Sequence, residues 1–187
     1  MYTDLTSCRS LIGFILLASN DQLTASSQAD TFHGTDRSRL NTQDLSSYAG
    51  AWVSGIQAVG QYIQADFRVV RHVERVATQG RSTYEQRVTS YRFAYSIDGT
   101  NYAFVANDDG SEKTFDGNYD GDTLVQHDFD PAFAARYVRL YPQTWNGRMS
   151  LRWEVYGCEI GKLTQKHNVC ILNHILVDAV VQYNVTN

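Results

Sequence analysis

The side chains best suited to chemistry in this sequence are five histidines, three cysteines and one short run of Asp and Asn. The histidines are scattered, and no pair has the spacing of zinc ligands with Cys or a carboxylate. The sequence contains no GxSxG, HExxH, CxxC or P-loop motif. These absences predict a domain that is not an enzyme and that binds no cofactor and no metal.

The run of acidic and amide residues matches half of a calcium loop. Asp116, Asn118, Asp120 and Gly121 fit the first positions of an EF-hand, but the position of its bidentate Glu is taken by His127. No helix is predicted on either side of the run. Asp and Asn side chains readily bond to their own backbone in β-turns, so we interpret the run as a turn.

Length and composition predict one globular domain rich in β-structure. The chain has 187 residues, of which 43% are hydrophobic and 19% charged, and it holds 12 Tyr, 8 Phe and 3 Trp against 2 Pro. A net charge of -4 with scattered arginines excludes nucleic acid as the main partner. No apolar run is long enough for a transmembrane helix. The apolar residues 11–17 lack a preceding basic segment and a usual cleavage site, so no signal peptide is expected.

Alternating apolar residues predict strands from residue 61 onward. The segments are 61–70, 72–79, 88–96, 124–129, 135–141 and 150–156. In residues 88–96, Tyr91, Phe93 and Tyr95 share one face, and Asp98-Gly99 then marks a hairpin turn. Many short strands separated by Gly, Asp and Asn turns indicate an all-β sandwich or barrel.

The cysteines frame this strand-rich region. Cys8 and Cys158 bracket nearly all of it, an arrangement that suits one bridge between its two ends, although three free buried thiols are the alternative. Cys170 is left over and either pairs with another chain or domain or stays unpaired. Asn184 begins a glycosylation sequon, which is consistent with secretion.

Ordered segments between the two bracketing cysteines resemble the discoidin domain, also called the factor V/VIII type C domain. The matching segments are QLTASS (22–27), RLN (39–41), AW (51–52), QYIQADF (61–67), ATQGR (77–81), VTSYRFAYSIDG (88–99), FDGN (115–118), ARYVRLYP (135–142) and SLRWEVYGC (150–158). The resemblance implies an eight-stranded, jelly-roll-like β-sandwich over residues 8–158, closed by a Cys8–Cys158 disulfide. Residues 1–7 are then a short lead, and residues 159–187 are a tail or linker.

In the discoidin family, loops called spikes bind the ligand at one end of the sandwich. The resemblance places the spikes within residues 28–38, 54–59 and 81–87. The candidate ligand-binding residues are Phe32, His33, Arg37, Trp52, Ile56, Tyr84 and Arg87. For Trp52, a plug beneath the loops is favoured over ligand contact. Ordinary surface solvation is the alternative for Arg37 and Arg87, and an isolated exposed histidine is the alternative for His33.

The resemblance implies a non-catalytic recognition or cell-adhesion module, located outside the cell or at its surface. Membrane-binding members carry bulky apolar tips above a basic collar. Here the tips are a single Phe, a single Ile and a Tyr beside Glu85, and the first spike carries Asp30 and Asp36 against Arg37. We therefore expect a cell-surface glycan or an extracellular protein as partner. Peripheral binding to anionic phospholipid, phosphatidylserine in particular, is the alternative.

Overall fold

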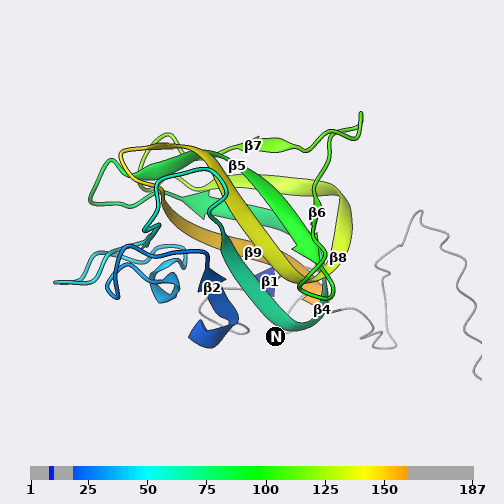
Figure 1. Ribbon diagram of the computed structural model, residues 1–187, viewed down its shortest axis with the longest axis horizontal. Helices are drawn as coiled ribbons and strands as arrows, with labels where there is room; N and C mark the ends of the chain where they lie inside the picture. The colour runs from blue at the N-terminus through cyan, green and yellow to red at the C-terminus, as the bar shows by residue number, and fades with distance from the viewer. Residues whose placement is uncertain (1–8, 11–18, 160–187) are drawn as a thin grey trace, which may run out of the picture.

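The computed structural model describes residues 9–10 and 19–159, and most regular structure in these residues is β-strand (Figure 1). Two single-turn 3-10 helices, η1 (Asn20–Gln22) and η2 (Thr35–Arg37), are the exceptions. The strands are β1 (Arg9–Ser10), β2 (Leu23–Ala25), β3 (Trp52–Val53), β4 (Ile63–Gln79), β5 (Arg87–Ser96), β6 (Ala103–Phe104), β7 (Thr114–Asp116), β8 (Val125–Asn146) and β9 (Ser150–Glu159).

Strands β4 and β8 run through both layers of the fold. The first part of β4 pairs with β2 and with residues 137–140 of β8, whereas residues 71–79 pair with β9 and with the first part of β8. On the other side of β8, β5 continues the sheet to β6 and β7. All these pairings are antiparallel, so one hydrogen-bonded sheet folds over into a sandwich. The predicted all-β sandwich is confirmed.

The strand boundaries differ from the sequence prediction at two places. Residues 61–70 and 72–79 form the single strand β4, and residues 124–129 and 135–141 belong to the single strand β8. The described residues thus contain four long strands and five of two or three residues, nine in all rather than eight. The difference arises because the pairing of β4 with β8 stops at Asp66 and resumes at Arg71, so the strand continues past the irregularity, which the break in side-chain alternation does not reveal.

A carboxylate holds the bend in β4. The pairing register shifts between Asp66 and Arg71, and Arg68 has a positive φ of 65°. Asp66 accepts a hydrogen bond from the Arg68 backbone N–H at 2.7 Å and from Arg136 Nε and Nη2 at 2.9 and 3.1 Å. Burial by itself raises the pKa of Asp66, but these hydrogen bonds outweigh it and lower the pKa. The charged carboxylate therefore stabilises a backbone conformation that residues other than glycine rarely adopt.

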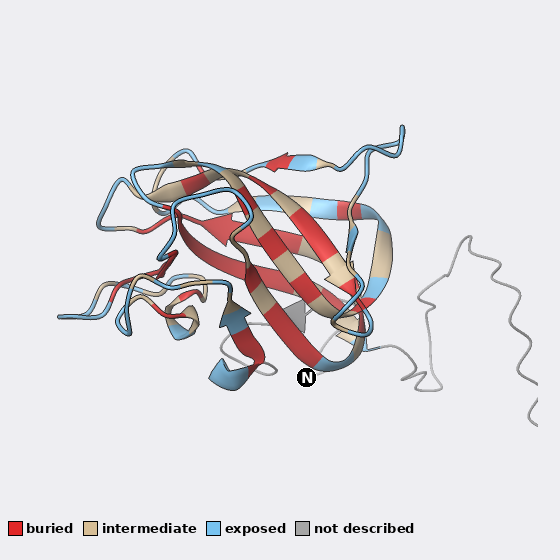
Figure 2. Cartoon of the chain, viewed as in Figure 1, coloured by how far each residue is buried: buried red, intermediate tan, exposed pale blue. Residues whose placement is uncertain are grey.

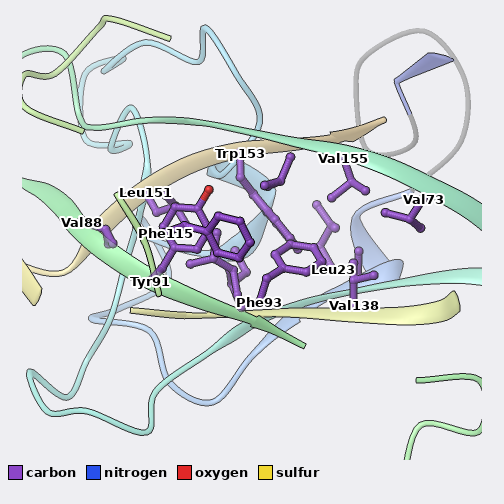
Figure 3. Close-up of a cluster of buried hydrophobic side chains, with 14 of the residues drawn as sticks. Leu23, Val73, Val88, Tyr91, Phe93, Phe115, Val138, Leu151, Trp153 and Val155 are labelled. Atoms are coloured by element: carbon purple, nitrogen blue, oxygen red, sulfur yellow. The ribbon is translucent and has the colours of Figure 1, made fainter. Parts of the chain in front are cut away.

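Inward-facing side chains of both layers form one apolar core. Tyr91 and Phe93 of β5 face Leu151, Trp153 and Val155 of β9 (Figure 3), and all five are fully buried. Buried and less buried residues follow one another along β5 and β8 (Figure 2). Tyr91 and Phe93 of β5 are buried as the period of two predicts, but Ala94 on the other face of the strand is buried as well. The predicted Asp98-Gly99 turn is also present, with Gly99 at a φ of 78°.

One arginine of β9 ties three loops to the sheet. Arg152 is fully buried; its Nε donates to the Gly80 carbonyl at 2.6 Å, and Nη1 donates to the Thr42 carbonyl at 2.9 Å. Its Nη2 donates to the Gly121 carbonyl at 2.6 Å and to Asp122 Oδ1 at 2.9 Å. Loops therefore cover this side of β9 and converge on the guanidinium.

The cysteine bridge implied by the resemblance remains a prediction, because Cys8 lies outside the described residues, as do Cys170 and Asn184. Cys158 is partly exposed near the end of β9. Strand β1 pairs with β9 in an antiparallel register that sets Arg9 opposite Gly157. Directly opposed residues in such a pair have a Cα separation within the disulfide range.

Non-reducing peptide mapping of secreted protein is expected to recover residues 8 and 158 in one cross-linked peptide, and two free thiols would contradict this.

Replacing the buried arginine is expected to loosen the loops and destabilise the domain. Arg152→Met leaves three carbonyls and one carboxylate without their donor, which we expect to cost about 3 kcal/mol of unfolding free energy. For a chain of this size the thermal midpoint should fall by roughly 10 °C. Arg75→Met removes an exposed ion pair with Asp128 and serves as the control. Equal melting of both variants would show that the Arg152 contacts do not stabilise the fold.

Candidate functional site

Three loops lie together at one end of the sandwich, at the left in Figure 1, where the segments around residues 28–51 and 80–86 project from the sheets. The Ala29 N–H donates to the Val53 carbonyl at 2.9 Å, which joins the first spike to β3. Ser82 Oγ donates to Gln43 Oε1 at 3.1 Å, and Asn146 Nδ2 donates to the Glu85 carbonyl at 2.5 Å. These contacts link the first spike to β3, and they link the third spike to the loop at residues 41–50 and to the β8–β9 turn.

An aromatic pair stands at the tip of the first spike. Phe32 is 41% exposed and meets the ring of Tyr48 edge to face, with the ring centroids 5.4 Å apart. Asp30 accepts hydrogen bonds from His33 Nδ1 at 2.7 Å and from the Phe32 N–H at 2.8 Å. These two bonds, that of His33 first, lower the pKa of Asp30. The ionised Asp30 thus fixes the backbone that carries Phe32.

The side chain of Arg37 is engaged in hydrogen bonds that stabilise the first spike. Its Nε donates to the Ala49 carbonyl at 2.7 Å and its Nη2 to the Gln43 carbonyl at 2.8 Å. Its guanidinium lies 5.9 Å from the centre of the Tyr48 ring. The hydrogen bonds of Arg37 hold the loop that presents Tyr48.

The third spike presents Tyr84, which is 51% exposed. The guanidinium of Arg81 lies 4.1 Å from the centre of the Tyr84 ring, and Arg81 forms an ion pair with Asp44. Arg87, at the start of β5, is mostly covered and donates from Nη1 to Glu85 Oε2 at 2.6 Å. Tyr84 is therefore the outward-facing candidate of this loop, whereas Arg87 is mostly covered.

The second spike is apolar and rests on a polar base. Ile56 is 53% exposed, and Val59 beside it is exposed as well. Gln57 holds this loop, because its Oε1 accepts from the Met149 N–H at 2.6 Å and its Nε2 donates to the Ser54 carbonyl at 2.7 Å. The expected position of Ile56 at the spike surface agrees with this geometry.

Trp52 needs a correction as a ligand-contacting residue. Its side chain is fully buried, and its Nε1 donates to the Ser27 carbonyl at 3.0 Å. The ring fills the space beneath the spikes and offers no surface to a ligand. This is the plugging role that the sequence favoured, and the physical reason is that β3 runs under the loops rather than out of them.

Exposed apolar residues gather at the spike end. Of the ten large apolar side chains that are exposed in the described residues, seven lie on the spikes or on the loops beside them: Phe32, Leu45, Tyr48, Ile56, Val59, Tyr84 and Tyr119. Sequence reasoning missed Leu45, Tyr48 and Tyr119. Local sequence does not identify Tyr48 as part of this group, because the contact between Phe32 and Tyr48 depends on two loops meeting.

The charges of this end nearly cancel. Over residues 28–51, 54–62, 80–87, 117–123 and 146–149 the sequence has six carboxylates and five arginines. Asp44 is held ionised: burial alone raises its pKa, but hydrogen bonds from Arg81, Thr83 and the Gly50 N–H lower it. The end of the sandwich therefore lacks a basic collar.

The half-match to a calcium loop is a turn. Asp120 Oδ1 accepts from the N–H groups of Asp122 and Thr123 at 3.0 and 2.6 Å, and Asn118 Nδ2 donates to the Thr123 carbonyl at 2.8 Å. The predicted backbone bonding is confirmed. In the part of the chain that the structure describes, no three His, Cys, Asp or Glu side chains are grouped to hold a metal ion. That part also contains no helix long and apolar enough to cross a membrane.

Two groups of named relatives are similar to this chain in sequence. Discoidin-2 of Dictyostelium discoideum is 33% identical over 143 residues, which are 74% of this chain and 54% of that protein. Human neuropilin-1 is 34% identical over 145 residues, which are 75% of this chain and 15% of that protein. The chain thus spans about half the length of the first relative and a small part of the second.

Solved structures agree with the fold. Wild-type discoidin II of Dictyostelium discoideum superposes with a TM-score of 0.73 at 29% identity, over 84% of this chain and 61% of that one. A CBM32 module of Clostridium perfringens, in complex with GalNAc-β-1,3-galactose, has a TM-score of 0.55 at 16% identity, over 81% of this chain and 100% of that one, and shows the fold alone.

The sequence model of the F5/8 type C domain matches residues 22–155, a span that runs from the residue before β2 into β9 and includes all three spikes. This chain therefore belongs to the F5/8 type C, or discoidin, domain family.

Proposed function

We propose that this domain is a non-catalytic recognition module that binds a cell-surface glycan, or an extracellular protein, through its spike loops. The observation that carries the proposal is the gathering of seven exposed apolar side chains, four of them aromatic, at the spike end. Domains of this family are binding modules for carbohydrate, protein or phospholipid. The sequon at Asn184 and the predicted disulfide support a location outside the cell or at its surface.

The chemistry of the spike end favours a neutral glycan. Flat aromatic faces such as those of Phe32, Tyr48 and Tyr84 pack against the apolar face of a sugar ring, and nearby polar groups bind its hydroxyls. Six carboxylates and five arginines give almost no net charge, so a charged ligand gains little. The likeness to a CBM32 module solved with GalNAc-β-1,3-galactose makes that disaccharide a reasonable first probe.

Peripheral membrane binding is the second candidate, and the exposed Ile56 and Val59 favour it because both are aliphatic and stand on one loop. Insertion of two such side chains contributes little without attraction to anionic headgroups. The near-neutral spike end supplies little of that attraction. We therefore rank the membrane below a glycan or protein partner.

Substitution of the aromatic tip should weaken glycan binding. A multivalent form of the chain is applied to a glycan array that includes GalNAc-β-1,3-galactose, because single-site affinity is expected to be low. Phe32→Ala and Tyr48→Ala are each expected to reduce the apparent affinity about tenfold, through loss of ring packing. Ile97→Ala, which removes an exposed apolar side chain just beyond the other end of β5, is the matched control. Unchanged binding in both tip variants would contradict the site.

A liposome experiment separates the two candidates. The same multivalent chain is sedimented with vesicles of phosphatidylcholine alone and with vesicles that contain phosphatidylserine, at low and moderate salt. We expect no selective sedimentation with phosphatidylserine. Selective sedimentation that weakens with salt and is lost in Ile56→Ser would instead establish the membrane as partner.

A further inference from the structure

One ion pair joins the two loops that carry exposed tyrosines. Arg81 Nε donates to Asp44 Oδ1 at 3.0 Å, and Arg81 Nη2 donates to the same oxygen. Asp44 belongs to the loop of Tyr48, whereas Arg81 opens the loop of Tyr84. Both members of the pair are largely covered, with side-chain exposures of 18% and 10%. A covered, two-donor Arg–carboxylate pair is more restrictive in geometry than a single surface contact.

The same guanidinium supports the ring of Tyr84. It lies 4.1 Å from the ring centre, and Arg81 Nη1 also donates to Gln86 Oε1 at 3.3 Å, two residues beyond the tyrosine. The loop backbone closes around this contact, because the Arg81 N–H donates to the Gln86 carbonyl at 3.0 Å. Tyr84 therefore has one face near the guanidinium while half of its surface stays open.

Asp44 connects this contact to the neighbouring loop. It directly precedes the Leu45–Tyr48 turn, in which the two residues exchange backbone hydrogen bonds at 2.9 and 2.8 Å. The carboxylate that pairs with Arg81 therefore links the third spike to the loop that presents Tyr48 against Phe32.

We propose that Arg81 is a positioning residue, which orients Tyr84 for the ligand and, through Asp44, fixes its position relative to Tyr48. The proposal rests on the proposed function, in which these rings contact the ligand. An exposed tyrosine that is already oriented loses less side-chain freedom when it binds. Two rings held at a fixed separation select a rigid ligand with more than one apolar face, such as an oligosaccharide longer than one unit.

Arg81→Lys tests the role of the planar guanidinium. Lysine keeps a positive charge for Asp44 but lacks the plane that lies against Tyr84. The full chain is compared as wild type, Arg81→Lys, Tyr84→Ala and the double variant, for binding to beads that carry GalNAc-β-1,3-galactose. Each single variant is expected to bind about tenfold more weakly. The double variant is expected to bind no more weakly than Tyr84→Ala, because Arg81 acts through Tyr84. If the affinity losses of the two single variants multiply in the double variant, the proposal is wrong.

A second readout does not depend on the ligand. The NMR signals of the Tyr84 ring and of the Arg81 Nε–H report their stacking directly. We expect Arg81→Lys to shift the Tyr84 ring signals and Tyr84→Ala to shift the Arg81 Nε–H signal. Arg92→Lys, which alters the ion pair of Arg92 in β5 with Glu112, is the control. It should shift neither the Tyr84 ring signals nor the Arg81 Nε–H signal.

The two readouts separate failure of this inference from failure of the proposed function. Tyr84 ring signals that stay unchanged in Arg81→Lys would refute positioning, whatever the beads show. Wild-type chain that fails to bind the beads would count against the disaccharide as ligand, and the NMR comparison would then decide on Arg81 alone. Thermal midpoints of all variants check that the fold is intact.

Discussion

Arg152 carries its positive charge into the interior of the protein, where three carbonyl oxygens and one carboxylate oxygen surround it. A buried charge is costly unless its donors are satisfied, so the loops that supply those oxygens cannot move away independently. They are the segments around Thr42, Gly80 and Gly121, which lead to the loop of Tyr48, to the third spike and to the turn beside it. The placement of these three segments depends on this one guanidinium.

The sandwich determines which loops can meet at that end. Because β4 and β8 bend and continue through both layers, strand ends from both layers lie at the same edge of the fold. The spikes then need only short-range contacts to form one surface. Two further arginines act in the same manner as Arg152 at smaller scale: Arg37 braces the first spike, and Arg81 braces the third.

Several charged groups of the loops are paired with one another, as in Asp30–His33, Asp44–Arg81 and Glu85–Arg87. The exposed side chains of these loops include aromatic and aliphatic ones, such as Phe32, and polar ones, such as Ser47 and Thr83. In the proposed function, the rings pack against apolar faces of the ligand, and specificity depends on how firmly the rings are held.

The sequence by itself determined the fold class, because the alternation along residues 88–96 and 150–156 is typical of strands, and because the ordered motifs from residue 22 onward belong to one family. It also determined three of the exposed tips, Phe32, Ile56 and Tyr84. Only the tertiary structure decided that Tyr48 joins Phe32 and that Asp44 and Arg81 link two loops. These contacts connect residues far apart in the chain, and local periodicity carries no information about which loops meet.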